Sequence, residues 1–187
     1  MLNLSCIYHI DSVESTNTFA KELAVNGAPH ATVIIAGEQT NGRGRLGRTF
    51  FSVPGSIFMS FIMKRDYFPH WDYATIFAVL AVSRAIEDVC KKTVTIKWVN
   101  DILYNDKKIC GILCESQLSD WLVIGAGVNL TVPADGFPDS IKGRAGALYE
   151  NGKPPKEALT AAIIEYMLSC ADDETRIKNE YNMKIRR

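Results

Sequence analysis

The chain has 187 residues, of which 47% are hydrophobic and 22% are charged, and these proportions are typical of a folded globular protein rather than a disordered one. Because 21 basic residues balance 21 acidic residues, the composition argues against a protein that binds nucleic acid over much of its surface. Any anion site must come from a local cluster of charge. The longest apolar run, residues 73–82, has about half the length of a membrane-spanning helix, so no membrane association is expected.

The cysteines indicate a reducing compartment. Their number is odd and no two form a Cys-x-x-Cys pair, so we expect reduced thiols, most of them small core residues, in a cytoplasmic protein. They are Cys6, Cys90, Cys110, Cys114 and Cys170. The first ten residues lack the basic region and the small-residue cleavage site of a signal peptide, which agrees with a cytoplasmic location.

Hydrophobic periodicity and turn residues predict the elements in chain order. They are a strand over residues 6–10, a helix from Ser15 or Thr16 to Val25, strands over 31–36 and 56–63, a helix over 71–90, strands over 94–98, 101–104, 108–115 and 121–130, and a helix over 155–170. Residues 11–17 are predicted to form a polar turn, and no further element is predicted in the charged stretch after Asp172.

Two local signals refine this order. Asn105-Asp106 predicts a tight turn that joins two neighbouring strands into a hairpin, whereas Gly125 and Gly127 are predicted to interrupt the strand over 121–130. Because hairpins are frequent, regular βαβ alternation is not expected. The predicted fold class is α/β in the α+β sense, a single domain over residues 1–187 with a mixed, largely antiparallel sheet flanked by helices.

Residues 42–48 combine three glycines with three arginines. The glycines match the spacing G-x-G-x-x-G, but a dinucleotide-binding fold needs a helix directly after this motif and here a strand is predicted. Three arginines so close in sequence repel one another unless an anion binds, and glycines let the backbone approach a ligand. We therefore expect a loop that is mobile when empty and ordered by an anion; a solvated basic turn or an RNA-binding patch is the alternative.

A second polar segment lies beside an apolar strand. Lys97-Trp98-Val99-Asn100-Asp101 is followed by Lys108, which alternates with Ile109 in a predicted strand and precedes Gly111. A lysine within an apolar strand loses hydration, so it needs an anionic partner. The alternative is a lysine that protects the edge of a sheet.

Taken together, five motifs in this order resemble those of the biotin protein ligases, also called biotin–[acetyl-CoA-carboxylase] ligases. The resemblance runs from about Tyr8 to Leu130. The motifs are Ser15-Thr16-Asn17, Gln39 with Gly42-Arg43-Gly44-Arg45-Leu46-Gly47-Arg48, Lys97-Trp98-Val99-Asn100-Asp101, Lys108 with Gly111-Ile112-Leu113, and Gly125-Ala126-Gly127-Val128-Asn129.

The resemblance implies a catalytic domain similar to class II aminoacyl-tRNA synthetases and a reaction in two steps. Biotin and MgATP give biotinyl-5′-AMP and pyrophosphate, and the biotinyl group then passes to one lysine of a biotin carboxyl carrier protein domain. Family members with an N-terminal helix-turn-helix bind DNA, and none is expected here. The small C-terminal β-barrel of full ligases is expected to be absent or truncated. Homodimerisation by strand pairing is implied on family grounds alone.

The resemblance also assigns roles to residues. Those implied in biotin binding are Ser15, Thr16, Asn17, Gln39, Arg43, Gly44, Arg45, Lys108 and Gly111. Those implied in binding ATP or the adenylate are Arg45, Arg48, Phe50, Asn100, Lys108 and Asn129. Those implied in catalysis are Arg43, Arg45, Lys108 and Asp101. No side-chain cluster for a metal is expected; Mg²⁺ would arrive with ATP, with Asp101 as its candidate ligand.

These residue types suit the chemistry. Neutral donors and acceptors can bind the ureido ring of biotin, and cations can neutralise a carboxylate that approaches an α-phosphate. Phe50 stands where the family usually has tryptophan, and Val99 where it commonly has proline. The alternatives are a lipoate or octanoate ligase or transferase of the same fold, and a non-catalytic module that binds biotin or nucleic acid.

Overall fold

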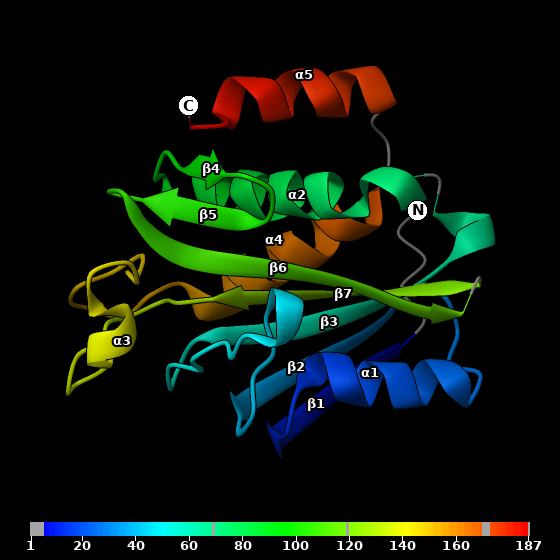
Figure 1. Cartoon of the computed structure of the whole chain (residues 1–187), viewed down its shortest axis with the longest axis horizontal. Helices are drawn as coiled ribbons and strands as arrows, with labels where there is room; N and C mark the ends of the chain where they lie inside the picture. The colour runs from blue at the N-terminus through cyan, green and yellow to red at the C-terminus, as the bar shows by residue number, and fades with distance from the viewer. Residues whose placement is uncertain (1–5, 69, 119, 170–172, 187) are drawn as a thin grey trace.

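The computed structural model describes residues 6–68, 70–118, 120–169 and 173–186 (Figure 1). Its strands are β1 (Cys6–Val13), β2 (Thr32–Gln39), β3 (Ile57–Lys64), β4 (Thr95–Lys97), β5 (Asp101–Tyr104), β6 (Lys107–Leu118) and β7 (Trp121–Val128). Its helices are α1 (Thr16–Val25), α2 (Ala74–Cys90), α3 (Asp139–Lys142), α4 (Lys156–Ser169) and α5 (Glu174–Lys184), with short 3₁₀ turns at Arg45–Gly47, Arg65–Tyr67 and Trp71–Tyr73.

The strands form one sheet in the order β1-β2-β3-β7-β6-β5-β4. β1 runs parallel to β2, and the remaining neighbours pair antiparallel. The predicted mixed, largely antiparallel sheet flanked by helices is therefore confirmed. In this order β7, which is last in sequence, lies between β3 and β6, so it joins the two halves of the sheet.

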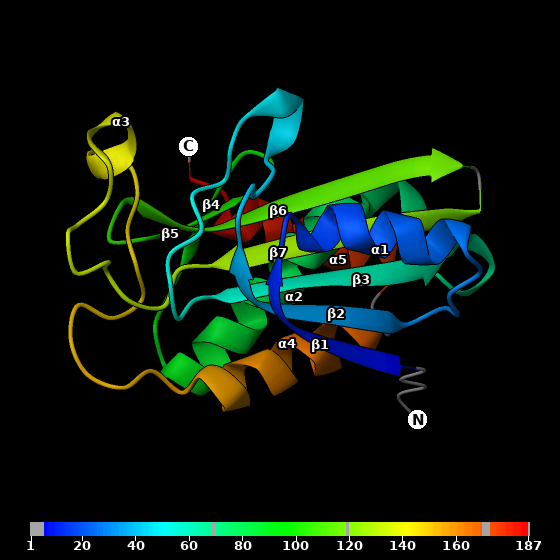
Figure 2. The ribbon, with the colours of Figure 1, turned by 90° about the horizontal axis from the view of Figure 1, so that it is seen from below.

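Helices cover both faces of the sheet (Figure 2). Side chains of β3 alternate between the faces because successive residues of a strand point in opposite directions. Met59 and Phe61 belong to the large core that includes α2 and α4, whereas Ile62 packs with Ala20 and Ala24 of α1. The face under α1 also carries Ser60, a fully buried polar residue among the apolar residues 57–63 of β3.

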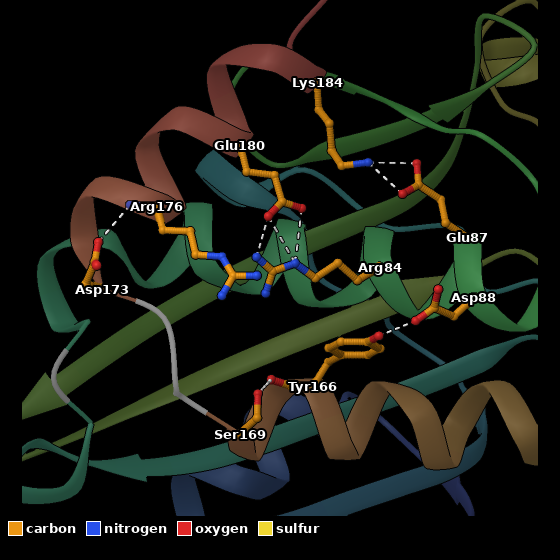
Figure 3. A network of polar contacts seen from close by, with 9 residues as sticks. All are labelled: Arg84, Glu87, Asp88, Tyr166, Ser169, Asp173, Arg176, Glu180 and Lys184. Carbon is orange, nitrogen blue, oxygen red and sulfur yellow. Dashed lines mark hydrogen bonds and ion pairs between the residues drawn. The ribbon is translucent and has the colours of Figure 1, made fainter.

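The expectation that no element follows Asp172 is wrong, because α5 lies against α2 beyond the edge strand β4 (Figure 1). Hydrophobic periodicity missed this helix because Ile177 and Tyr181 are its only buried residues. Ion pairs from Glu180 to Arg84 and from Lys184 to Glu87 attach the helix to α2 (Figure 3). Such partners, roughly a hundred positions away in sequence, leave no local pattern.

Other elements agree with prediction more closely. The hairpin between β5 and β6 turns at Asn105 and Asp106, both with positive φ (48° and 61°), as expected for a two-residue turn. β1 does not end at residue 10 but continues to Val13, because its last residues pair with the end of β2. β7 is not interrupted at Gly125 and Gly127; both glycines keep their pairing with β3 and β6.

The described cysteines are not paired in disulfides. Cys6, Cys90, Cys110 and Cys114 are free thiols, in agreement with prediction, and Cys170 lies outside the described residues. Cys110 is fully buried, and this burial raises the pKa of its thiol. Within the residues that the structure describes, no helix is long and apolar enough to cross a membrane.

Candidate functional site

A pocket lies on the face of the sheet under α1, where the start of α1 and the end of β2 meet β6 and β7. Its lining comes from segments far apart in sequence. The lining residues are Ser15, Thr16, Asn17, Gln39, Arg43, Phe50, Gly111, Leu113, Gly125, Ala126 and Gly127. The structure therefore brings together the first, second, fourth and fifth of the sequence motifs, which were separate on the chain.

Neutral polar groups form one wall of this pocket. The backbone N–H of Thr16 donates to Gln39 Oε1 at 2.9 Å, and the Thr16 hydroxyl donates to the same oxygen at 3.1 Å. Buried Ser60 Oγ lies 2.8 Å from Thr16 Oγ1 and 2.7 Å from Asn17 Oδ1. Ser15, the residue before α1, is also buried. This network fixes the orientation of uncharged donors and acceptors around an enclosed space.

A cluster of charged residues around Glu115 holds Asn17, which belongs to this wall. Asn17 Nδ2 donates to Glu115 Oε2 at 2.9 Å, and Lys21 Nζ lies 3.0 Å from Glu115 Oε1. Arg43 approaches the same carboxylate at 3.9 Å. Burial alone would raise the pKa of Glu115, but hydrogen bonds from Asn17 and Lys21 and the charges of Lys21 and Arg43 lower it below its ordinary value. Glu115 thus stays ionised and holds Asn17 in place.

Two glycines of β7 provide the floor of the pocket. A Cβ atom on Gly125 would lie 2.1 Å from Asn17 Oδ1, and one on Gly127 would lie 2.6 Å from Cε1 and Cζ of Phe50. Neither distance is compatible with a side chain at these positions unless the neighbour moves. The glycines that were expected to interrupt the strand instead make room for Asn17 and for the Phe50 ring.

The basic segment forms a narrow hairpin beside the pocket. The Phe50 backbone N–H donates to Gly42 O at 2.8 Å and that of Gly44 to Arg48 O at 2.7 Å, with the turn at residues 45–47. In Figure 2 the segment rises on the same side of the sheet as α1. All three arginines are exposed, and of the three Arg43 alone lines the pocket. The mobility expected of this segment stays a prediction.

The third motif lies beside the basic segment and meets the fourth. Arg45 donates to Asn100 Oδ1 at 3.4 Å, and Asn100 is held by β6 through a hydrogen bond from its Nδ2 to Ile112 O at 2.8 Å. Lys108 Nζ pairs with Asp101 Oδ1 at 2.7 Å. The expected anionic partner of Lys108 is therefore Asp101. The sheet-edge alternative is wrong, because β6 lies between β7 and β5.

Lys108 and Asn129 extend the site beyond the pocket. A Cβ atom on Gly111 would lie 3.2 Å from Lys108 Nζ, so the ammonium group reaches the pocket rim. Asn129 follows β7, and its Nδ2 donates to Gly146 O at 3.0 Å. Its Oδ1 is buried and has no hydrogen-bond partner among the described residues. A buried acceptor of this kind suits a ligand that carries an N–H donor.

Seven of the fourteen predicted site residues line the pocket. Gly44 and Arg48 do not line it, and Arg45, Asp101, Asn100, Lys108 and Asn129 lie around it. The roles implied for all fourteen stay predictions. Sequence reasoning missed Ser60, Glu115, Leu113 and the floor of β7 as site residues. A serine amid the apolar residues of β3 was the available signal for Ser60. Glu115 had none, because its partners Asn17 and Lys21 are distant in sequence.

A metal site built from side chains is not present in the part of the chain that the structure describes, since it contains no group of three or more histidine, cysteine, aspartate or glutamate residues that could hold an ion. Asp101 offers a single carboxylate, and Lys108 already neutralises it. These residues fit a divalent cation that is held mainly by another ligand, such as a polyphosphate.

Comparisons with known proteins agree with this arrangement. The sequence model of the Biotin/lipoate A/B protein ligase family matches residues 9–129. The bifunctional ligase/repressor BirA of Bacillus subtilis (strain 168) is 36% identical over 176 residues, which are 91% of this chain and 53% of that protein. The biotin–[acetyl-CoA-carboxylase] ligase of Paracoccus denitrificans is 35% identical over 150 residues, 76% of this chain and 58% of that protein.

Solved structures show the same fold. A biotin protein ligase from Aquifex aeolicus in complex with biotin and ATP has a TM-score of 0.84 and 28% identity, covering 97% of this chain and 78% of that one. The biotin protein ligase of Leishmania major in complex with biotinyl-5-AMP has a TM-score of 0.83 and 26% identity, covering 97% of this chain and 82% of that one.

The fold and the pocket thus define a class, the α+β domains whose mixed, largely antiparallel sheet carries a pocket beside a cluster of basic residues. Within this class, the chain belongs to the Biotin/lipoate A/B protein ligase family. It spans about half the length of the bacterial relatives described above, at 53% and 58%.

Proposed function

We propose that this protein activates biotin with ATP to biotinyl-5′-AMP and transfers the biotinyl group to a lysine of a biotin carboxyl carrier protein domain. One observation carries the proposal, namely that neutral hydrogen-bonding groups and the glycines of β7 line a pocket together with Arg43, with Lys108 at its rim. The printed names of the relatives, a biotin–[acetyl-CoA-carboxylase] ligase among them, support it, as do solved homologues with biotin, ATP or biotinyl-5-AMP.

Biotin fits the two ends of this pocket. Its ureido ring is neutral and both donates and accepts hydrogen bonds, which matches Ser15, Thr16 and Gln39. Its thioether ring is apolar, which matches Leu113 and Ala126 of the lining. Its carboxylate would then point toward the rim that carries Lys108. Binding therefore presents the reacting carboxylate to the cationic end of the site.

In the first step, a carboxylate oxygen of biotin attacks the α-phosphorus of ATP and pyrophosphate leaves. Both reactants are anions, so the reaction needs cations that neutralise them as they approach. Arg43, Arg45 and Lys108 are the cations around the rim. Closure of residues 42–48 over the pocket would also keep water from the mixed anhydride, which water would otherwise hydrolyse.

Asn129 and Phe50 are assigned to the nucleotide. The unpaired Asn129 Oδ1 suits the exocyclic amino group of adenine, which donates a hydrogen bond. Phe50 keeps an aromatic ring where the family usually has tryptophan, so it can stack on the base. Mg²⁺ would reach the site bound to the phosphates of ATP, with Asp101 as its nearest carboxylate on the third motif.

In the second step, the uncharged amine of the carrier lysine attacks the acyl carbon of biotinyl-5′-AMP. The C–N bond forms, the bond from the acyl carbon to the phosphate oxygen breaks, and AMP leaves with the electron pair. The amine loses its proton to solvent. Free thiols in the described residues agree with a reaction in the cytoplasm, where carboxylases that accept biotin would be encountered.

The test is the release of pyrophosphate from ATP, measured with biotin, lipoate, octanoate or no acid. Of these four conditions, we expect pyrophosphate release only with biotin. We also expect the mass of an added carrier domain to increase by one biotinyl group. Release with lipoate or octanoate and not with biotin would establish the alternative activity of the same fold. Binding of biotin in a calorimeter without pyrophosphate release in the presence of MgATP would instead indicate a non-catalytic binding module.

A further inference from the structure

The third motif, residues 97–101, is held on one side by β6. Asn100 exchanges two hydrogen bonds with Ile112, and Asp101 begins β5 and pairs with Gly111. On its other side the motif begins at the end of the edge strand β4, which comprises only Thr95–Lys97. Trp98, the second residue of the motif, is 70% exposed. An edge strand this short cannot hold Trp98 and Val99 rigidly by its own pairing. Yet Asn100 accepts a hydrogen bond from Arg45 and Asp101 pairs with Lys108, so the placement of two rim cations depends on this motif.

Helix α5 supports Trp98 and Val99. The Tyr181 hydroxyl donates to Val99 O at 3.2 Å, and its ring meets that of Trp98 edge to face with centroids 6.1 Å apart. Just after the helix, the backbone N–H of Arg186 donates to Ile96 O at 2.8 Å. The chain end thus pairs with β4 on its free side and contacts the motif directly. Tyr181 itself is 2% exposed.

Helix α5 is in turn fixed to the core of the domain. Glu180 and Lys184 form ion pairs with Arg84 and Glu87 of α2, which is packed against the sheet (Figure 3). The side chains of these four residues are only 19–27% exposed, so solvent screens them less than it screens fully exposed pairs. The contacts form a continuous path from α2 through α5 to Val99, Asn100 and the rim of the pocket.

We propose that Tyr181 is a positioning residue for adenylate formation: by holding Val99 it completes the support that β6 gives to Asn100 and Asp101, and through them it positions Arg45 and Lys108. This inference rests on the proposed function. The hydrogen bond and the ring contact of Tyr181 go to Val99 and Trp98, so it acts on the rim cations through the third motif. Small displacements of charge-stabilising groups slow catalysis strongly, whereas the hydrogen bonds of Ser15, Thr16 and Gln39 join residues outside α5.

The test compares Tyr181→Phe with Tyr166→Phe. Each variant loses one phenolic hydroxyl; that of Tyr166 bonds Asp88 and attaches α4 to α2, away from the site. For Tyr181→Phe we expect the kcat of biotin-dependent pyrophosphate release to fall by about 3- to 10-fold, which corresponds to the loss of one hydrogen bond, with the KM for biotin unchanged. Tyr166→Phe should keep the wild-type kcat.

A second readout does not depend on activity. The Ile112 backbone N–H donates to Asn100 O at 2.9 Å, so release of the motif should speed hydrogen exchange of this amide in Tyr181→Phe but not in Tyr166→Phe. An unchanged kcat in Tyr181→Phe, or equal losses in both variants, would overturn the proposal. A wild-type protein without pyrophosphate release would overturn the proposed function instead, and exchange at Ile112 would then decide whether Tyr181 holds the motif.

Discussion

Gly125 and Gly127 lie two residues apart on the same face of β7, yet replacing each by alanine should have different consequences. A Cβ on Gly125 would lie 2.1 Å from Asn17 Oδ1. Asn17 cannot move aside without losing hydrogen bonds to Ser60 (2.7 Å), Glu115 (2.9 Å) and Leu113 O (3.2 Å). A Cβ on Gly127 would lie 2.6 Å from the edge of the Phe50 ring. Phe50 comes directly after the exposed residues 45–49, so its ring can move away from Gly127.

The magnitude follows from these contacts. Overpacking a filled site costs about 1–3 kcal/mol, and displacing Asn17 adds the loss of hydrogen bonds, one of them to a carboxylate. We expect Gly125→Ala to lower the free energy of unfolding by about 2–4 kcal/mol, which for a domain of this size lowers Tm by about 5–15 °C. Gly127→Ala should lower it by less than about 1 kcal/mol, because only one ring must rotate.

The assay is thermal unfolding of three variants, combined with biotin titration in a calorimeter. Gly143→Ala is the matched control, because nothing lies within 4 Å of its Cβ position, and it should resemble the wild type in both measurements. Gly125→Ala and Gly127→Ala should both bind biotin at least about 10-fold more weakly, a loss of ~1.4 kcal/mol. Equal stability losses at Gly125 and Gly127 would refute the distinction between a fixed and a movable neighbour.

Three further results are expected. Lys108→Ala and Arg45→Ala should each slow biotin-dependent pyrophosphate release by about 10²-fold, with little change in Tm. Glu115→Gln should be less stable than the wild type at neutral pH. The pKa of Glu115 lies below its ordinary value of 4.5. The ionised carboxylate therefore contributes fully to the free energy of unfolding above pH 4.5, and this contribution disappears as the pH falls through the lowered pKa. The difference in Tm between Glu115→Gln and the wild type should narrow over the same pH range. Backbone amides of residues 42–48 should exchange with solvent more slowly once biotin and ATP are bound, because the ligand anions screen the repulsion between the arginines.

Each of these has a contrary outcome. Wild-type rates of pyrophosphate release in both Lys108→Ala and Arg45→Ala would remove the rim cations from the reaction. A Glu115→Gln variant whose Tm difference from the wild type stays constant between pH 7 and pH 4 would show that Glu115 is not held ionised by its neighbours. Equal exchange of residues 42–48 with and without ligand would contradict closure of the segment.

Sequence reasoning succeeded where the cause was local. The hairpin at Asn105-Asp106 follows from two residues that tolerate positive φ, and α1 begins after Ser15 as expected. Helix α5 was missed because two apolar residues, Ile177 and Tyr181, make its buried face and ion pairs provide the rest. Local hydrophobic periodicity contains no information about a partner that lies on another helix.

The same division holds for the site. Motif resemblance named most of the pocket lining, including Arg43 and Gly111, because their spacing is distinctive. It could not assign Gly125 and Gly127, which looked like strand breakers until the positions of Asn17 and Phe50 were known. Nor could it find Glu115, which enters the site only because β6 lies opposite α1 in the folded sheet. Tertiary contacts decided these roles.

The strand order has a consequence for how a bound ligand affects stability. β1, α1, β2 and β3 form one unit continuous in sequence, β4 to β7 form a second, and the two units meet in the sheet only where β3 pairs with β7. The pocket straddles this seam, since Ser15, Gln39 and Arg43 come from the first unit and Gly111 and Gly127 from the second. A ligand in the pocket therefore contacts both units of the chain. Because it binds only where the two units are assembled, its binding raises the free energy of unfolding.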